Sequence, residues 1–553
     1  MTSRDGKWCL NFNGELYNHF TLRSRVGGEF QGTSDTESLV EYIAAYGVAE
    51  ALAVIDGIFA FTALNVETGE LYLARDPFGV KPLYYAQRST TTHLSSDVRP
   101  LVRIGCGGGM DSAVLETFLT LRFVPSPRTL LAGISRLPPG HFMRVDAETG
   151  ESETYRYVRP NEHRYHGTIE DAAVLYQSAL REAVRRQLVS DRPVGVLLSG
   201  GIDSAMLAAL AREFNWSVTG FTVGFGERYP HCEIADAAET AEELGIRHEE
   251  VTVTPDDLRD SLTEIVRSVE EPLGTTSIMP MWHLTRLAKS RADVVFSGHG
   301  NDELWGGYRR YRIEMLLGQY PQLKGKLFDL SEWTSRLPPS DAVRRGLECL
   351  GNNDTASRFR SAYSLFTARD IRDMTGSDVA GTALEPIAYW LDWLRGAGEM
   401  PDLERMMRID TRLGLADDSL LYADKVSMAA GLETRVPMLD RDLVRFIDSL
   451  PIDYRTRFSE TKVLHRAMAR DYLPARIVDR PKKGFLVPFG TWSRGIWRDF
   501  VAERLLDRGT KLHDHIRRDA IESLWRRHQR GISDRSRQVF SLLMLSGWCE
   551  EFL

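Results

Sequence analysis

Cysteine is scarce in this sequence of 553 residues: there are five cysteines, and no two of them form a Cys-x-x-Cys pair. Zinc sites, iron–sulfur clusters and disulfide frameworks need paired or clustered cysteines. The sequence therefore argues against these three classes of site, and we expect reduced thiols.

Long hydrophobic runs and an excess of positive charge are also missing. We find no run of eighteen apolar residues and no charged-then-apolar leader, so the sequence predicts neither a membrane span nor export, and we expect a cytoplasmic protein. The formal net charge is −8, which leaves no basic footprint for nucleic acid over the whole chain. With 43% hydrophobic and 26% charged residues, the chain has the composition of a globular protein. Its length predicts two or three domains.

One glycine-rich stretch carries the clearest chemical signal. The apolar run from Val194 to Leu198 predicts a buried strand, which passes through Ser199, Gly200 and Gly201 into a helical pattern that opens at about Ile202. Adjacent glycines let backbone N–H groups converge on an anion, and a helix N-terminus adds about half a positive charge. The stretch therefore predicts a phosphate site.

The polar residues of this stretch narrow the choice of ligand. Ser199 and Ser204 can donate hydroxyl hydrogen bonds, and Asp203 places a carboxylate beside the phosphates, which predicts a Mg²⁺ ion between them. No Gly-Lys-Ser/Thr follows, so the spacing is not the Walker pattern. The motif Ser-Gly-Gly-Ile-Asp-Ser resembles instead the loop of the PP-loop ATP pyrophosphatases. That resemblance implies cleavage of ATP to AMP and pyrophosphate, with Leu198 and Val223 lining the adenosine pocket.

Strands and helices alternate around the motif. We expect helices at 169–188, 205–214 and 233–244, a further helix that ends at 269, and strands at 218–225 and 249–253. This alternation predicts a doubly wound parallel sheet, whose ligands lie at the carboxyl ends of the strands.

A second apolar strand runs into glycines and an acid between Asp293 and Tyr308. This block, Asp-Val-Val-Phe-Ser-Gly-His-Gly-Asn-Asp-Glu-Leu-Trp-Gly-Gly-Tyr, resembles a block of the asparagine synthetases. The resemblance implies that Ser297 and Gly298 contact the nucleotide, and that Asp302 joins the earlier aspartate of the glycine loop in binding Mg²⁺. A simple cap on the following helix is the alternative role for Asp302.

The residue after Ser-Gly in this block departs from the family. Asparagine synthetases usually carry an acid there, which is implicated in forming the acyl-adenylate or deprotonating the amine, whereas this chain has His299. A histidine titrates near neutrality and can serve as a base. We therefore expect His299 to be catalytic, with an acceptor that can differ from the family's.

The first part of the chain reads as a sheet with few helices. We expect a strand from Trp8 that meets a turn at Asn13-Gly14, strands at 58–64 and 70–75, and a helix at 35–46. Four blocks resemble the glutaminase domain of class II glutamine amidotransferases: Asn13–Asn18, Gly32–Glu37, Asp56–Phe61 and Arg75–Tyr84. The resemblance implies an oxyanion hole at Asn13 and Gly14, with Glu15 and Asp35 holding the amino group of glutamine.

The nucleophile of that family is an N-terminal cysteine far upstream of the Asn-Gly-Glu segment, but only twelve residues precede Asn13 here. Cys9 carries a peptide bond and cannot supply the free amine that serves as the base. Either this half is a disabled remnant, or the start was assigned to an internal methionine; we favour the second because Met-Thr-Ser-Arg-Asp-Gly reads as the middle of a domain. We expect the polypeptide as printed to use ammonia and not glutamine.

Beyond Tyr311 the pattern is mainly helical, and Asp410 to Met428 is the clearest amphipathic stretch. Arg480-Pro-Lys482-Lys483 matches an Arg-x-Lys pattern of the asparagine synthetases. We take Lys482 as the catalytic lysine, because a lysine on a glycine-bearing loop can stabilise the charge that develops as pyrophosphate leaves. An ordinary surface basic pair is the alternative.

These resemblances cover nearly the whole chain. They imply an incomplete Ntn-type αββα glutamine amidotransferase-like domain at 1–155, a polar linker at 151–167, and a doubly wound α/β PP-loop synthetase domain with a helical C-terminal part at 168–553. The implied activity is that of an asparagine synthetase-type ligase, which uses ATP and Mg²⁺ to adenylate a carboxylate, aspartate by default, before ammonia attacks and AMP and pyrophosphate leave.

Three alternatives stay open: a β-lactam-synthetase-like cyclase, a lasso-cyclase-like enzyme, and an amidotransferase for another carboxylate. We expect small-molecule substrates, no nucleic acid or membrane partner, and leave open a homodimer.

Overall fold

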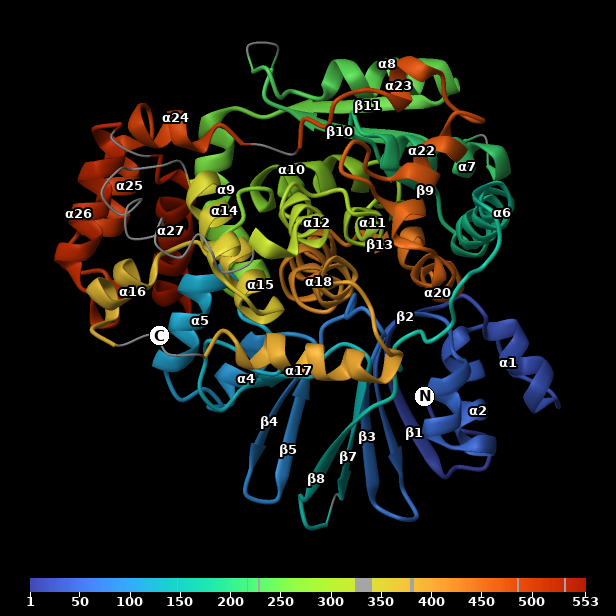
Figure 1. Ribbon diagram of the computed structural model, residues 1–553. Coiled ribbons are helices and arrows are strands. Elements are labelled where there is room, and N and C mark those ends of the chain that lie inside the picture. The colour runs from blue at the N-terminus through green and yellow to red at the C-terminus, as the bar shows by residue number, and fades with distance from the viewer. Residues whose placement is uncertain are drawn as a thin grey trace.

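The computed structural model describes residues 1–553 except 147, 216, 227–228, 324–340, 378–381, 485–486 and 532–533. A sheet-rich N-terminal part lies below a larger α/β part in Figure 1, and helices from the C-terminal third flank the larger part. In the described part of the chain, no helix combines the length and apolarity needed to cross a bilayer.

The N-terminal part contains two antiparallel sheets. One has the strand order β1-β2-β3-β7-β8 and the other the order β5-β4-β6. The strands are β1 (Trp8–Leu16), β2 (Gly57–Asn65), β3 (Glu70–Arg75), β4 (Tyr84–Arg88), β5 (Thr91–Ser95), β6 (Ser135–Arg136), β7 (His141–Asp146) and β8 (Ser152–Arg156), and the helices are α1 (His19–Val26), α2 (Asp35–Tyr46), α3 (Val48–Val54), α4 (Val98–Arg103) and α5 (Ser112–Leu121). Apolar side chains of β1, β2 and α2, including Leu16, Leu39 and Phe59, form a buried core between sheet and helix.

The expected turn at Asn13-Gly14 is wrong, because β1 continues through both residues. Asn13 pairs with Ala60 and Gly14 with Phe59. A Cβ on Gly14 would lie 2.1 Å from the carbonyl oxygen of Ile58. Gly14 is therefore needed for the close approach of two strands and not for a change of direction.

The expected linker is also shorter than the sequence suggested. Residues 152–156 form the strand β8, which pairs antiparallel with β7. Most of its side chains are exposed at the edge of the sheet, so the strand shows no alternation of apolar and polar residues.

The larger part is built on a five-stranded parallel sheet with the order β11-β10-β9-β12-β13. The strands are β9 (Val194–Leu197), β10 (Thr219–Gly224), β11 (Arg247–Thr252), β12 (Val294–Phe296) and β13 (Glu433–Arg435), and the first helices are α6 (Ile169–Gln187), α7 (Ile202–Phe214), α8 (Ile234–Leu244), α9 (Pro255–Val269) and α10 (Ile278–Lys289). The prediction of a doubly wound parallel sheet is confirmed. Chain order reverses between β9 and β12, which makes their carboxyl ends the topological switch point where ligands bind.

The remaining elements are helical. They are α11 (Asn301–Trp305), α12 (Tyr311–Gln319), α14 (Asp341–Gly351), α15 (Thr355–Tyr363), α16 (Ala368–Thr375), α17 (Glu385–Leu394), α18 (Asp402–Asp410), α19 (Leu420–Met428), α20 (Arg441–Ser449), α21 (Ile452–Arg455), α22 (Val463–Ala469), α23 (Ala475–Val478), α24 (Phe489–Arg494), α25 (Arg498–Leu506), α26 (Arg518–Gln529) and α27 (Ser536–Phe552). Shorter helical turns are η1 (Pro321–Leu323), η2 (Arg395–Ala397), η3 (Leu415–Ser419), η4 (Pro437–Leu439) and η5 (Lys511–Asp514).

The segment from Asp410 to Met428 is not the amphipathic helix that we expected. It breaks into the end of α18, the π-helical turn η3 and α19, and its side chains are buried on almost every side. Three of its acids, Asp417, Asp418 and Asp424, pair with cations of the N-terminal part and so lie at the boundary between the two parts of the protein.

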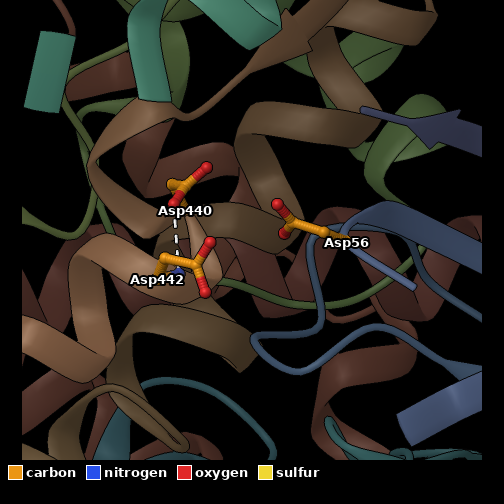
Figure 2. Close-up of side chains that lie close together, drawn as sticks. All are labelled: Asp56, Asp440 and Asp442. Carbon is orange, nitrogen blue, oxygen red and sulfur yellow. Dashed lines mark hydrogen bonds between the residues drawn. The ribbon is translucent and has the colours of Figure 1, made fainter. Parts of the chain in front are cut away.

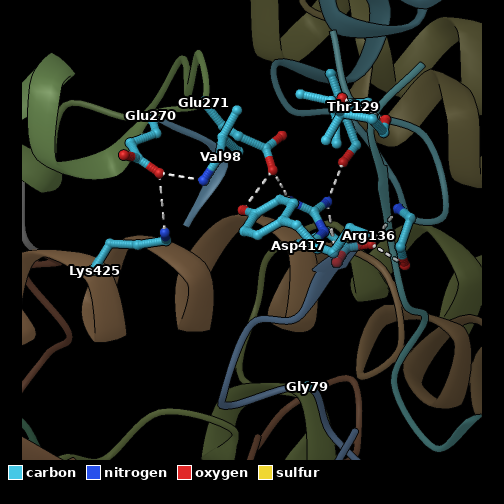
Figure 3. A network of polar contacts seen from close by, with 12 residues as sticks. Gly79, Val98, Thr129, Arg136, Glu270, Glu271, Asp417 and Lys425 are labelled. Atoms are coloured by element: carbon cyan, nitrogen blue, oxygen red, sulfur yellow. Dashed lines mark hydrogen bonds and ion pairs between the residues drawn. The ribbon is translucent and has the colours of Figure 1, made fainter. Parts of the chain in front are cut away.

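Buried charges hold that boundary together (Figure 3). The Arg136 guanidinium pairs with Glu271, which also accepts a hydrogen bond from the Tyr84 hydroxyl at 2.7 Å. Another nitrogen of Arg136 lies 3.3 Å from Asp417 in η3. Arg136 and Tyr84 belong to the N-terminal part and the two acids to the larger part, so the contact is made between the parts.

We expect Arg136→Met to lower the free energy of unfolding by about 3–5 kcal/mol, because it leaves a buried carboxylate without its cation. Chemical denaturation of the purified protein measures the loss. Arg128→Met is the matched control, since Arg128 pairs with Glu385 at 3.2 Å through side chains that are 48% and 69% exposed, and it should cost less than about 1 kcal/mol. Equal losses in the two variants would contradict a stabilising role for the buried network.

Candidate active site

Two glycine-containing loops meet at the switch point of the parallel sheet. One follows β9 at Ser199 and the other follows β12 at Ser297, and β9 and β12 are paired neighbours. A Cβ on Gly200 would lie 2.8 Å from the Cβ of Asp236, and one on Gly298 would lie 3.4 Å from the Cβ of Asp203. Glycine thus keeps side chains out of a crowded loop.

The two serines of the first loop bond to each other and to the loop backbone. Their hydroxyl oxygens are 2.9 Å apart, the Ser199 N–H donates to the Ser204 oxygen at 2.9 Å, and the Gly201 N–H donates to the Ser199 oxygen at 3.1 Å. The hydroxyls are therefore positioned at the helix N-terminus of α7, where an anion is favoured. Their predicted contact with phosphate stays a prediction.

The structure brings Asp203 and Asp302 together. Asp203 lies in the first turn of α7 and Asp302 in α11, and the Lys462 ammonium bridges them, with Nζ 2.5 Å from Asp203 Oδ2 and 2.7 Å from Asp302 Oδ1. Asn301 donates to the other oxygen of Asp203, which also lies 3.4 Å from His465 Nε2. Neither acid acts only as a helix cap.

Both carboxylates stay ionised. Burial acts to raise the pKa of Asp203, but Lys462, His465 and Lys482 together outweigh it and hold that pKa well below its usual value. Burial is opposed in the same way at Asp302, where Lys462 and Lys482 together lower the pKa. Two ionised oxygen ligands are what a hard divalent cation requires.

Sequence reasoning missed Lys462. It precedes α22 with φ 60° and ψ 41°, a left-handed conformation that costs a non-glycine residue about 1–2 kcal/mol. A Cβ on Gly307 would lie 2.0 Å from Asp302 Oδ1 and 2.7 Å from Lys462 Cε, so this glycine leaves room for the ion pair. No sequence pattern around Lys462 identifies it as a site residue. Its left-handed backbone conformation is a signal, but that conformation is visible only in the structure.

Lys482 contacts one of these acids, Asp302, from the loop that follows α23. Its ammonium pairs with Asp302 and lies 5.1 Å from the centre of the Tyr308 ring, although the side chain is 48% exposed. Arg480 ties this loop to the glycine loop, because it donates to the carbonyl of Gly200 at 3.1 Å. Lys483 pairs with Asp236 at 2.5 Å instead, so Lys482 is the lysine of the pair that faces the two acids.

His299 does not titrate near neutrality, contrary to the sequence expectation. Burial lowers its pKa to about 4, and nearby Asp302 opposes that shift only in part. Its Nδ1 lies 2.6 Å from the Ser297 hydroxyl. Glu303 titrates in the neutral range instead, because burial and the charge of Asp410 raise its pKa to about 7.

The predicted glutamine contacts lie on β1 and at the start of α2. Asp35 accepts a hydrogen bond from the Leu16 N–H at 2.9 Å, which fixes it beside the Asn13, Gly14 and Glu15 segment. Asn13 Nδ2 donates to the Ser96 hydroxyl at 3.4 Å. The structure therefore brings all four residues together at one end of β1.

Glu15 also connects this region to the parallel sheet. Burial raises its pKa to about 7, opposed by the charge of Arg435, whose Nη2 lies 3.6 Å from Glu15 Oε1. Arg435 belongs to β13, and its carbonyl accepts the N–H of Ser297 at 2.9 Å. One residue thus contacts both predicted sites.

A third acidic group, Asp56, Asp440 and Asp442, has carboxylate oxygens within 4.8 Å of one another (Figure 2). Arg186 lies among them, 2.8 Å from Asp440 and 3.3 Å from each of the other two. The guanidinium offsets part of this negative charge, and Asp440 caps α20 by accepting from the Asp442 and Leu443 N–H groups. We read the group as a joint between the two parts and not as a metal site.

Comparison with known proteins agrees with this arrangement. Residues 175–550 match the asparagine synthase family, and residues 1–158 match the glutamine amidotransferase domain. An asparagine synthetase [glutamine-hydrolyzing] of Bacillus subtilis is 29% identical over 552 residues, which cover 99% of this chain and 86% of that protein. A putative asparagine synthetase [glutamine-hydrolyzing] of Mycobacterium tuberculosis is 31% identical over 562 residues, covering 98% of this chain and 84% of that protein.

These matches run through both parts of the fold and include the two glycine loops and their acids. The chain belongs to the asparagine synthase family of ligases, with a glutamine amidotransferase domain in its N-terminal part.

Proposed function

We propose that the protein is an ATP-dependent amide-forming ligase that adenylates L-aspartate and transfers ammonia to it, releasing AMP and pyrophosphate. The observation that carries the proposal is the meeting of Asp203 and Asp302 beside a glycine loop at the switch point of the sheet. Two ionised acids at an anion-binding helix N-terminus suit a nucleoside triphosphate bound with a divalent cation.

The nucleotide contacts follow from the two loops. We assign the phosphates to the loop residues, and the adenosine to a surface that includes Leu198 and Val223, which lie at the carboxyl ends of the neighbouring strands β9 and β10 and are almost fully buried. The phosphate contacts are Ser199, Gly200, Gly201, Ser204, Ser297 and Gly298. Because the strand ends are apolar and the loops are polar, base and phosphates would be separated along the sheet edge.

Asp203 and Asp302 fit a magnesium ion by the chemistry of their donors, since Mg²⁺ takes one or two carboxylates and keeps several waters. When bound, the ion would neutralise charge on the departing pyrophosphate. Lys482 would stabilise the same charge through its ammonium, and the loop that carries it is fixed by the bond from Arg480 to Gly200. His299, neutral and bonded to Ser297, would orient groups by hydrogen bonding and would not carry charge.

The proposal also covers the source of nitrogen, which we assign to the N-terminal part. We infer that Asn13, Gly14, Glu15 and Asp35 contact glutamine, and that ammonia is the species that attacks the adenylate. A cytoplasmic location, where ATP and both amino acids are available, fits this activity.

A panel of carboxylic acids tests the reaction. We expect exchange of labelled pyrophosphate into ATP that depends on aspartate, and formation of AMP without ADP when ammonium is added. Formation of ADP and phosphate, or exchange that needs no carboxylate, would overturn the proposal.

An amidotransferase for another carboxylate is the second candidate. His299 favours it, because a buried neutral imidazole stands where a charged acid is usual in asparagine synthetases. The same panel separates the two: exchange supported by a second acid and not by aspartate would select this candidate and keep the adenylation chemistry.

The pH dependence tests whether a protein group that titrates near neutrality controls the step. Free ammonia increases about tenfold per pH unit below the pKa of ammonium, so the rate at subsaturating ammonium should rise with that slope across the neutral range. The pKa of His299, about 4, keeps the imidazole uncharged throughout, and His299→Gln should leave the slope unchanged between pH 6 and pH 8. A break near pH 7 that Glu303→Gln removes would show that Glu303, whose pKa is about 7, controls the step.

A further inference from the structure

We propose that Lys462 holds the place of the divalent cation until a nucleoside triphosphate arrives, so that the metal enters this site only together with the nucleotide. The inference rests on the proposed function, because it concerns the same two acids. It adds an order of binding and assigns a gating role to Lys462, a residue to which the sequence analysis assigns no function.

The Lys462 ammonium occupies the position that a shared cation would take. Nζ lies within 2.7 Å of one oxygen of each acid, and the lysine side chain is only 5% exposed. A second ammonium, that of Lys482, contacts the other oxygen of Asp302. A metal ion that ligated both acids would have to displace at least the first of these groups.

Charge balance opposes the entry of a bare metal ion. The two carboxylates and two ammonium groups sum to zero, and a divalent cation alone would leave two uncompensated positive charges in a largely buried site. Displacing a charged partner without offering it a new one is costly in such surroundings. The other neighbours of Asp203 are Asn301 and His465, which cannot supply negative charge.

A triphosphate removes this obstacle. It brings up to four negative charges to the loop at Ser199, and its outer phosphates can accept hydrogen bonds from the ammonium groups that leave the acids. The backbone of Lys462 is held independently of its ammonium group: its N–H donates to the carbonyl of Trp305, and its carbonyl accepts from the N–H of Arg466. The ammonium can therefore change partners without a change in the backbone. The long flexible side chain can then shift while the backbone stays in place.

Binding of Mn²⁺, followed by the paramagnetic resonance of the free ion, tests the order without any turnover. We expect the wild-type chain to bind Mn²⁺ alone at least tenfold more weakly than Lys462→Met. Adding the non-cleavable analogue α,β-methylene-ATP should give the wild type one tight Mn²⁺ per chain. The site of the Lys462→Met variant should disappear in Lys462→Met/Asp203→Asn, which lacks one of the ligands.

Two further variants separate charge from other effects. Lys462→Arg keeps the positive charge and should remain closed to free Mn²⁺. Lys289→Met removes a lysine from an ion pair with Asp293, at the opposite end of β12, and should also behave as the wild type. Circular dichroism and a thermal melt establish that each variant is folded.

Tight binding of Mn²⁺ by the wild type without nucleotide would overturn the inference, and this arm needs no variant at all. A folded Lys462→Met that gains no affinity would overturn it too. In both of those cases Mn²⁺ binding together with nucleotide would persist and the proposed function would stand. If the wild type failed to bind Mn²⁺ even with the analogue, the metal assignment to the two acids would fail, and the inference with it.

Discussion

Asp203→Asn should abolish carboxylate-dependent exchange between ATP and pyrophosphate while the protein stays folded. The substitution hardly changes side-chain volume, but it removes the negative charge that faces the metal and Lys462. Losing the stabilisation that a metal gives to a developing phosphate charge is worth several kcal/mol, or about 10³-fold in rate. The exchange rate measures the loss of activity, and a circular dichroism spectrum of the same sample shows whether the variant is folded.

Asp293→Asn is the matched control for this experiment. Asp293 precedes β12 at the end remote from the glycine loops, where it pairs with Lys289, so its loss should change the exchange rate by less than about twofold, as for an exposed ion pair. Unchanged exchange in Asp203→Asn would refute the metal assignment. If Asp203→Asn unfolded while Asp293→Asn stayed folded, the ion pairs among Asp203, Asp302 and Lys462 would be shown to stabilise the fold.

Lys482→Ala should lower turnover by about 10²-fold or more and leave ATP binding within a few-fold, the pattern of a charge contact made in the transition state. The Lys482 side chain is half exposed and paired with Asp302 at rest, so the ground state gains little from it. Comparing the dissociation constant of the nucleotide with kcat in the same preparation separates binding from turnover.

Lys483→Ala distinguishes a specific contact from the general charge of the loop. Lys483 pairs with Asp236 and does not reach the two acids, so its loss should change kcat much less than the loss of Lys482 does. Similar reductions in the two variants would point to the loop charge as a whole. Equal losses of binding and turnover in Lys482→Ala would make that lysine a ground-state ligand.

The resemblance to the asparagine synthetases implied the meeting of Asp203 and Asp302, and the fold supplies the physical reason for it. Both acids follow apolar strands that run into glycines, and parallel strands present their carboxyl ends at one edge of a sheet. The adjacency of β9 and β12 then brings the acids together without any knowledge of side-chain packing.

Lys462 could not be found in this way. It lies on neither strand, and it reaches the acids only because a short turn between the paired residues Thr456 and Thr461 returns the chain to Trp305. The pKa of His299 was misjudged for a related reason, since its shift comes from burial by residues distant in the sequence.

The N-terminal part shows the same limit at the level of backbone. An Asn-Gly pair usually signals a turn, because glycine accepts the required dihedral angles. At Gly14 the glycine serves the approach of a neighbouring strand instead, with the carbonyl of Ile58 where a side chain would be. Local preference and tertiary contact call for the same residue here, and the sequence alone does not distinguish them.

Arg435 has a practical consequence for anyone who wishes to study the synthetase half alone. Its backbone pairs with the strand that ends at the second glycine loop, and its guanidinium depends on Glu15 for part of its charge balance. A fragment that begins near residue 168 would lack the N-terminal partners of these groups. The Arg435 guanidinium would lose Glu15, and Asp417 in η3 would lose Arg136 and Arg75, so both groups would be exposed to water. We expect such a fragment to precipitate when expressed by itself. It should become soluble when residues 1–158 are produced in the same cell as a separate polypeptide. The enzyme would then tolerate a break between its two parts far better than the loss of either part.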